Sequence, residues 1–229
     1  MTSMIGKLFL SAAFVTALAA GALAQGAPVQ LQPAKPAAAK PAPKPAAAVD
    51  DKEAVQRANA HLNSVQTMIA DFVQIAGDGR RSEGKLYVQK PGRMRFEYSR
   101  PATLEIVSDG TSVAVRDRKL ATQDVYLIGQ TPLKFLLRDR IDISRDTKVL
   151  DVQTTPNAVF VMIEDKATLG GTSRIKLVFD PASFTLKQWT VNDPQGSDTV
   201  VSLFNVDTGR KPDPAVFKIN TERMLNTNR

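Results

Sequence analysis

The side chains that most often carry out chemistry in enzymes are scarce in this chain. It has one histidine, His61, and no cysteine. A nucleophilic serine or cysteine needs a nearby base, and metal sites built from histidine and cysteine need several such ligands. The glycine-rich motifs that bind nucleotides and the G-x-S-x-G motif of serine hydrolases are also absent from the sequence. We therefore predict a binding protein that is not an enzyme, with no catalytic residue, no metal site and no cofactor.

A few isolated polar side chains remain as candidates. His61 lies beside the apolar stripe of a predicted helix, where a lone histidine is most often structural. Lys90 is more unusual, because it shares the apolar phase of a predicted strand. An unpaired charge buried there would cost several kcal/mol. Three explanations stay open: the Lys90 ammonium reaches water at a rim, pairs with an acid, or donates hydrogen bonds to backbone carbonyls of a lid helix.

The segment that carries Lys90 has the clearest pattern in the chain. Apolar and polar side chains alternate from residue 85 to residue 98, with a Pro91-Gly92 turn signal in the middle. A period of two is typical of a strand in an antiparallel sheet that is covered on one face. The apolar phase consists of Leu86, Val88, Met94, Phe96 and Tyr98, together with Lys90.

Further strands follow at intervals of roughly ten residues, separated by turn signals such as Asp109-Gly110. Because strands and helices do not alternate regularly, a parallel sheet is disfavoured. The pattern predicts one large antiparallel sheet, a sandwich or a barrel. The expected strands cover residues 68–74, 103–107, 113–116, 125–128, 149–152, 158–163, 174–179, 186–191 and 199–205.

Two helices are expected among the strands. The first begins after Asp50, a candidate N-cap with Glu53 as its capping-box partner. The second is short and covers about residues 131–138, with Thr131 as N-cap and Pro132 in the first helical position. Leu133, Leu136 and Leu137 share one face of this short helix. Two interpretations of it stay open, namely a connector that plugs one end of a barrel and a lid over an apolar cavity.

The ends and the charge of the chain complete the domain prediction. Residues 1–24 have the anatomy of a cleaved signal peptide, with an apolar run and an Ala22-Leu23-Ala24 cleavage site. Residues 25–49 are rich in proline, alanine and lysine and are expected to be a disordered linker. The folded domain should then span residues 50–229. The net charge of +7 is spread along the chain, and outside the cytosol a nucleic-acid partner is not expected.

Several segments in order resemble one family, the periplasmic outer-membrane lipoprotein carrier family (LolA). They are Ala70-Asp71-Phe72-Val73-Gln74, the run from Gly84 to Tyr98, Val107-Ser108-Asp109-Gly110 and Thr131-Pro132-Leu133. Each piece alone is weak evidence, whereas their order and spacing behind a signal peptide are specific. The similarity extends from about Ala54 to the region of Phe217.

The resemblance implies a mainly β fold, an open and incomplete antiparallel β-barrel (a half-barrel) with a helical lid. It also implies a monomeric periplasmic chaperone that receives lipoproteins from an inner-membrane ABC exporter and passes them to an outer-membrane receptor. The side chains expected to bind the acyl chains of the cargo are Phe72, Leu86, Val88, Met94, Phe96, Tyr98, Ile106, Leu133, Leu136 and Leu137.

Lys90 departs from the family pattern, which usually has arginine at this place to tie the strand to the lid. A lysine cannot form the two parallel hydrogen bonds of a guanidinium, so a latch made by Lys90 would be weaker or differently built. An alternative function is also open. A half-barrel of this type could serve as a sensor or regulatory domain that binds a protein or lipid signal and not cargo.

Overall fold

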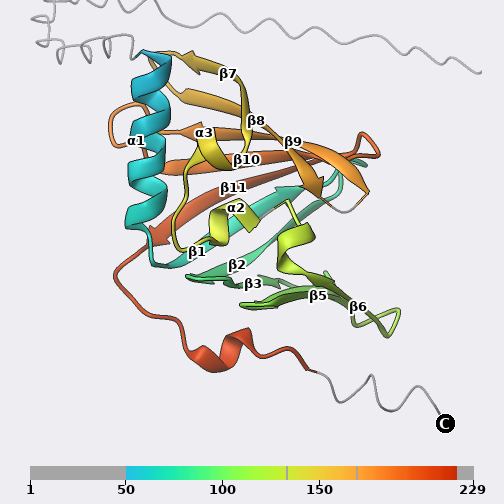
Figure 1. Ribbon diagram of the computed structural model, residues 1–229. Coiled ribbons are helices and arrows are strands. Elements are labelled where there is room, and N and C mark those ends of the chain that lie inside the picture. Colours follow the sequence, from blue (N-terminus) through green and yellow to red (C-terminus); the bar gives the residue numbers. More distant parts are fainter. Residues whose placement is uncertain (1–49, 133, 169, 221–229) are drawn as a thin grey trace, which may run out of the picture. The chain divides into compact units, whose positions relative to one another are not determined.

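The computed structural model describes residues 50–132, 134–168 and 170–220, which form one folded unit (Figure 1). The predicted signal peptide, residues 1–24, and the predicted linker, residues 25–49, lie outside the described residues, as does Leu133. None of the helices in the described part is both long enough and apolar enough to cross a membrane.

The described unit is built on a single antiparallel sheet of 11 strands in the order β6-β5-β4-β3-β2-β1-β11-β10-β9-β8-β7. Within the described residues the two edge strands, β6 and β7, do not pair with each other, so the sheet stays open. This confirms the predicted open antiparallel architecture. The strands are β1 (Thr67–Ile75), β2 (Arg81–Gln89), β3 (Arg93–Tyr98), β4 (Leu104–Asp109), β5 (Ser112–Asp117), β6 (Thr122–Leu127), β7 (Lys148–Thr154), β8 (Val159–Thr168), β9 (Gly171–Phe179), β10 (Leu186–Asn192) and β11 (Asp198–Asp207).

The alternation in the sequence determines which face of the sheet is covered. In β8 and β9, Val161 lies opposite Leu177 and Ile163 lies opposite Ile175, and all four side chains are fully buried. In β2 and β3, Leu86 lies opposite Phe96 and belongs to the same core. Because every second residue of a strand points to the same side, these residues form one continuous apolar face, which we call the inner face.

Three α-helices lie on the inner face (Figure 1). They are α1 (Asp51–Ser64), α2 (Lys134–Leu137) and α3 (Ile143–Asp146), and two 3₁₀ turns, η1 (Ile128–Gln130) and η2 (Pro214–Phe217), complete the structure. Helix α1 begins where the sequence predicts, but the Asp50 side chain makes no capping hydrogen bond. Helix α2 is shorter than predicted, and the hydroxyl of Thr131 donates a hydrogen bond to the carbonyl of Ile128 at 2.9 Å.

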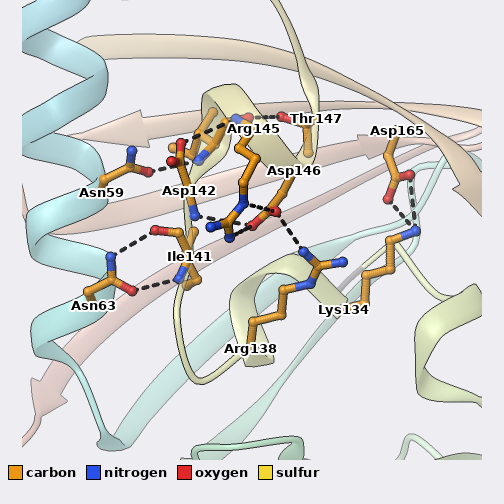
Figure 2. A network of polar contacts seen from close by, with 11 residues as sticks. Asn59, Asn63, Lys134, Arg138, Ile141, Asp142, Arg145, Asp146, Thr147 and Asp165 are labelled. Atoms are coloured by element: carbon orange, nitrogen blue, oxygen red, sulfur yellow. Dashed lines mark hydrogen bonds and ion pairs between the residues drawn. The ribbon is translucent and has the colours of Figure 1, made fainter.

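A network of polar contacts ties the segment from α2 to α3 to its neighbours (Figure 2). From α1, the amide of Asn63 exchanges two hydrogen bonds with the backbone of Ile141, at 2.7 and 2.8 Å. Four residues earlier on the same helix face, the Asn59 side chain accepts a hydrogen bond from the backbone N–H of Ile143. Arg138 pairs with Asp146 at 2.8 Å, which links the end of α2 to α3. This segment is therefore held against α1 by side chains that bond to its backbone.

Helix α2 is also fixed to the sheet at both of its ends. Its first residue, Lys134, forms an ion pair with Asp165 of β8 at 2.9 Å (Figure 2), and both side chains are almost completely buried. At its last residue, the carbonyl of Leu137 accepts a hydrogen bond from the N–H of Gly92 in the β2–β3 turn. Because β8 and the β2–β3 turn lie far apart in the strand order, α2 bridges the two halves of the sheet.

Candidate functional site

The principal candidate site is a cavity of about 480 Å³ between the C-terminal end of α1, helix α2 and the inner face of the sheet. Its walls come from α1, α2, the β-strands β1, β2 and β3, and the strands β10 and β11. Strands from both sides of the central β1–β11 pair thus meet at one cavity. Its volume lies within the range of about 300–1,000 Å³ that is usual for sites of small organic ligands.

The floor of the cavity is apolar because the inward-facing apolar residues of β2 pair with inward-facing apolar residues of the neighbouring strands β1 and β3. Val88 lies opposite Met68 of β1 and opposite Met94 of β3, and all three side chains line the cavity. Helix α2 contributes Leu136 and Leu137 to the wall. The buried side chains among the lining residues are Leu62, Leu86, Val88, Met94, Leu137, Leu186, Trp189 and Leu203.

The predicted cargo residues fall into two groups. Five of them line the cavity, namely Leu86, Val88, Met94, Leu136 and Leu137. Four others lie in or against the hydrophobic core beside the cavity, namely Phe72, Phe96, Tyr98 and Ile106. The last, Leu133, is outside the described residues.

The second group is built around an aromatic cluster. The Phe72 ring meets the rings of Phe96 and Tyr98 edge to face, with centroids 5.0 and 5.1 Å apart. Gly84 lies between Phe72 and Tyr98 in the strand register. A Cβ atom at Gly84 would come within about 2 Å of the carbonyl oxygen of Glu97, so the strands approach closely there. The Tyr98 hydroxyl donates a hydrogen bond to Gln74, and burial raises the pKa of this phenol.

Lys90 lines the cavity and is half-buried, just beyond the end of β2. Its ammonium donates a hydrogen bond of 2.5 Å to the carbonyl of Leu62 in the last turn of α1. Of the three explanations raised for Lys90, the structure therefore shows a bond to a backbone carbonyl, but the carbonyl belongs to α1 and not to the short helix α2. Burial lowers the pKa of Lys90 to about 8, and the charge of Asp139 partly opposes this shift.

His61 joins α1 to the sheet. Its Nε2 atom accepts a hydrogen bond from the backbone N–H of Leu186 at 3.2 Å. Burial lowers the pKa of this imidazole, and the positive charges of Lys90 and Lys187 lower it further. A neutral imidazole that accepts at Nε2 carries its proton on Nδ1. The hydrogen bond to the sheet agrees with the structural role predicted for His61, although the side chain also lines the cavity.

Sequence reasoning missed several residues of the cavity wall. Trp189, the single tryptophan of the chain, lines the cavity and contacts the Phe96 ring with centroids 6.4 Å apart. Leu186 and Leu203 complete the wall from β10 and β11. The strands that carry these residues were predicted, and their alternation could have placed them on the inner face. Their position at the cavity, however, depends on the pairing of β1 with β11, which the local sequence does not reveal.

The arrangement is suited to binding an apolar ligand. Within the described residues, no group of three or more potential metal-ligating side chains lies together. The titratable groups of the cavity wall are His61, Lys90 and Lys187. Polar side chains, among them Ser64, Thr185, Asn205 and Thr208, also line the cavity beside its apolar floor. An apolar floor with polar groups beside it is typical of sites that bind lipids or other hydrophobic ligands.

Comparisons with known proteins find one family model and several similar chains. Residues 63–220 match the family model described as outer membrane lipoprotein carrier protein LolA. The outer-membrane lipoprotein carrier protein of Methylococcus capsulatus is 28% identical over 173 residues, which cover 72% of this chain and 82% of that protein. The protein of the same name from Legionella pneumophila is 30% identical over 167 residues, covering 69% of this chain and 81% of that protein. A solved structure of a LolA superfamily protein from Nitrosomonas europaea aligns with a TM-score of 0.43 and 9% identity, over 75% of this chain and 98% of that one.

Proposed function

Because this chain belongs to the outer-membrane lipoprotein carrier family LolA, we propose that it carries lipoproteins through the periplasm to the outer membrane by holding their acyl chains in the cavity on the inner face. The observation that supports this most directly is the cavity of about 480 Å³ with a floor of buried aliphatic and aromatic side chains. An acyl chain gains about 0.8 kcal/mol for each methylene group removed from water, so such a cavity can retain it without any polar contact.

Helix α2 is the part of the structure best placed to act as a lid. It provides Leu136 and Leu137 to the cavity wall and is attached to the sheet at both ends, through Lys134 and through the Leu137 carbonyl. Cargo that needs more room than the cavity offers would have to displace this helix. Of the two interpretations of the short helix, the lid is therefore the one we propose.

The setting of this function is also a proposal. The segment before the folded unit, residues 1–49, carries the predicted signal peptide and linker, so we propose export to the periplasm and cleavage before Gln25. There the protein would receive lipoproteins from an inner-membrane ABC exporter and pass them to an outer-membrane receptor. We propose that it works as a monomer without cofactors and catalyses no reaction.

Native mass spectrometry of the protein isolated from the periplasm tests the proposal. A carrier should retain a fraction of molecules with a bound lipoprotein or acyl lipid, and Val88→Phe, which narrows the cavity, should reduce that fraction. A matched preparation of Val161→Phe, altered in the core beside β9, controls for loss of folded protein. If the wild-type protein is always free of lipid and instead co-purifies with a fixed protein partner, the sensor function is the better description.

A further inference from the structure

One wall of the cavity does not involve the lid helix α2. It is the contact between the last turn of α1, which contributes His61 and Leu62 to the lining, and the start of β10, which contributes Leu186 and Lys187. We call this contact the α1–β10 seam. Because residues from both of its sides line the cavity, separation of the end of α1 from β10 would open the cavity to solvent.

Among the described residues, two side chains of α1 make polar contacts across the seam. The Arg57 guanidinium donates a hydrogen bond of 3.3 Å to the carbonyl of Ala182 and lies 4.0 Å from the centre of the Phe184 ring. One helical turn later, the Nε2 atom of His61 accepts a hydrogen bond of 3.2 Å from the backbone N–H of Leu186. Of these two contacts, the one made by His61 lies at the cavity.

The His61 contact exists only while the imidazole is neutral. A neutral imidazole has one acceptor nitrogen, whereas an imidazolium has two N–H donors and no acceptor. Protonation at Nε2 would therefore set one donor against another and leave the Leu186 N–H without its partner. Histidine is the side chain that ordinarily changes its charge in the range of about pH 5 to 8, so mild acid acts on this contact and leaves the Arg57 contact intact.

The charged groups around the seam also favour the neutral imidazole. Burial lowers the pKa of His61, and the positive charges of Lys90 and Lys187 lower it further. Two carboxylates act on these lysines, Asp139 on Lys90 and Asp180 on Lys187. In the described part of the chain neither carboxylate bonds to the imidazole. Since a proton on His61 is less favourable in the closed seam than in water, protonation favours the open seam.

Other contacts of α1 do not depend on this proton. Lys90 bonds to the carbonyl of Leu62, and Asn63 bonds to the backbone of Ile141 between α2 and α3. Neither contact involves β10. Loss of the His61 contact would therefore loosen one side of the end of α1 while the helix stays attached elsewhere, which is a local opening.

We propose that the α1–β10 seam is an acid-sensitive side gate of the cavity, in which protonation of His61 releases the Leu186 N–H and lets the end of α1 move away from β10. The proposal rests on the proposed carrier function and adds a route and a condition for the exchange of acyl chains. The gate is separate from the lid, because α2 is attached to β8 and to the β2–β3 turn.

Quenching of Trp189 fluorescence by acrylamide tests the gate without any ligand, because Trp189 is the single tryptophan and lines the cavity. The delipidated mature protein, free of affinity-tag histidines, is compared with His61→Gln. The glutamine Oε1 atom can accept from Leu186 at about the place of Nε2, but it does not titrate. From about pH 7 to about pH 5, we expect the quenching rate of the wild type to rise about threefold to tenfold, the effect of losing one hydrogen bond. The rate for His61→Gln should stay nearly constant.

NMR of the imidazole checks the cause of the change. His61 is the single histidine, so the ¹⁵N-histidine spectrum reports this side chain alone. Its titration should have the same midpoint as the change in quenching, below about 6.5. An equal rise in quenching for the wild type and His61→Gln, or no rise in the wild type while His61 titrates, would overturn the inference.

A fluorescent fatty-acid probe separates the gate from the carrier function. The dissociation rate of the probe from the wild type should rise by about the same factor over this pH range, and the rate from His61→Gln should not. If the probe binds but its dissociation does not depend on His61, the gate is wrong and the carrier site stands. If the probe does not bind at either pH, the proposed carrier site is wrong, whatever the quenching shows.

Discussion

Substituting Val88 by phenylalanine distinguishes a binding cavity from ordinary core. Val88 lies in register between Met68 and Met94, and the three side chains line the same space. A larger side chain there occupies space that the cavity already provides, so it need not displace packed neighbours as overpacking of a core does. The added ring removes some apolar surface from water, so we expect Val88→Phe to change the free energy of unfolding by about 0–1 kcal/mol, in the stabilising direction.

The matched control is Val161→Phe in β8. Val161 is fully buried and faces Leu177, so the same substitution there must displace neighbours and should destabilise the protein by about 1–3 kcal/mol. Both variants are compared by chemical denaturation and by displacement of a fluorescent fatty-acid probe. Val88→Phe should remain as stable as the wild type while its probe affinity falls about tenfold, corresponding to roughly 1.4 kcal/mol. If the two variants are equally destabilised, or if stable Val88→Phe binds the probe normally, the cavity is not the acyl site.

Three further predictions concern the edge of the cavity, the lid and processing. The pKa of Lys90 is about 8 in the folded protein and about 10.5 in the unfolded chain. Between these two pH values the unfolded chain therefore binds more protons than the folded protein. The stability of the wild type relative to Lys90→Met should therefore rise as the pH increases from about 8 to about 10.5, by roughly 1–2 kcal/mol after allowance for solvent screening of a half-buried side chain; denaturation curves with no pH-dependent difference would contradict this. A double-mutant cycle of Lys134→Met and Asp165→Leu should give a coupling energy of about 1.5–3 kcal/mol, because the ion pair is buried, and a value near zero would show that the pair does not hold α2. N-terminal sequencing of protein from the periplasm should begin at Gln25, and a chain that retains Met1 in a membrane fraction would refute cleavage.

The strands were predictable because their signal is local. Alternation alone places Leu86, Val88, Met94 and Phe96 on one face, and the structure buries all four side chains. The same alternation cannot separate cavity from core. Val88 and Phe96 share a phase, yet Val88 faces open space whereas Phe96 is covered by other rings. That difference depends on the opposite wall, which comes from distant parts of the chain.

The partners of charged side chains were the least predictable part of the site. The position of Lys90 in an apolar phase indicated that it needed a partner, but the partner, the Leu62 carbonyl, is on a helix that the chain brings close only after folding. The same holds for Lys134 and Asp165, which are far apart in sequence. Asn59 and Asn63 show a local signal, two amides four residues apart on a helix, that could have suggested contacts to a neighbouring segment.

Transfer of lipoprotein between membranes tests the central claim most directly. Inner-membrane vesicles that contain the lipoprotein exporter and a labelled triacylated lipoprotein are incubated with ATP and the mature protein, and the soluble fraction is then mixed with outer membranes. We expect the label to appear in a soluble complex with the protein and then in the outer membranes. Val88→Phe should be deficient, whereas Lys148→Glu, a change at an exposed residue of β7 outside the cavity wall, should be normal. If the label stays in the inner-membrane vesicles at the same level with and without the protein, this chain is not a lipoprotein carrier.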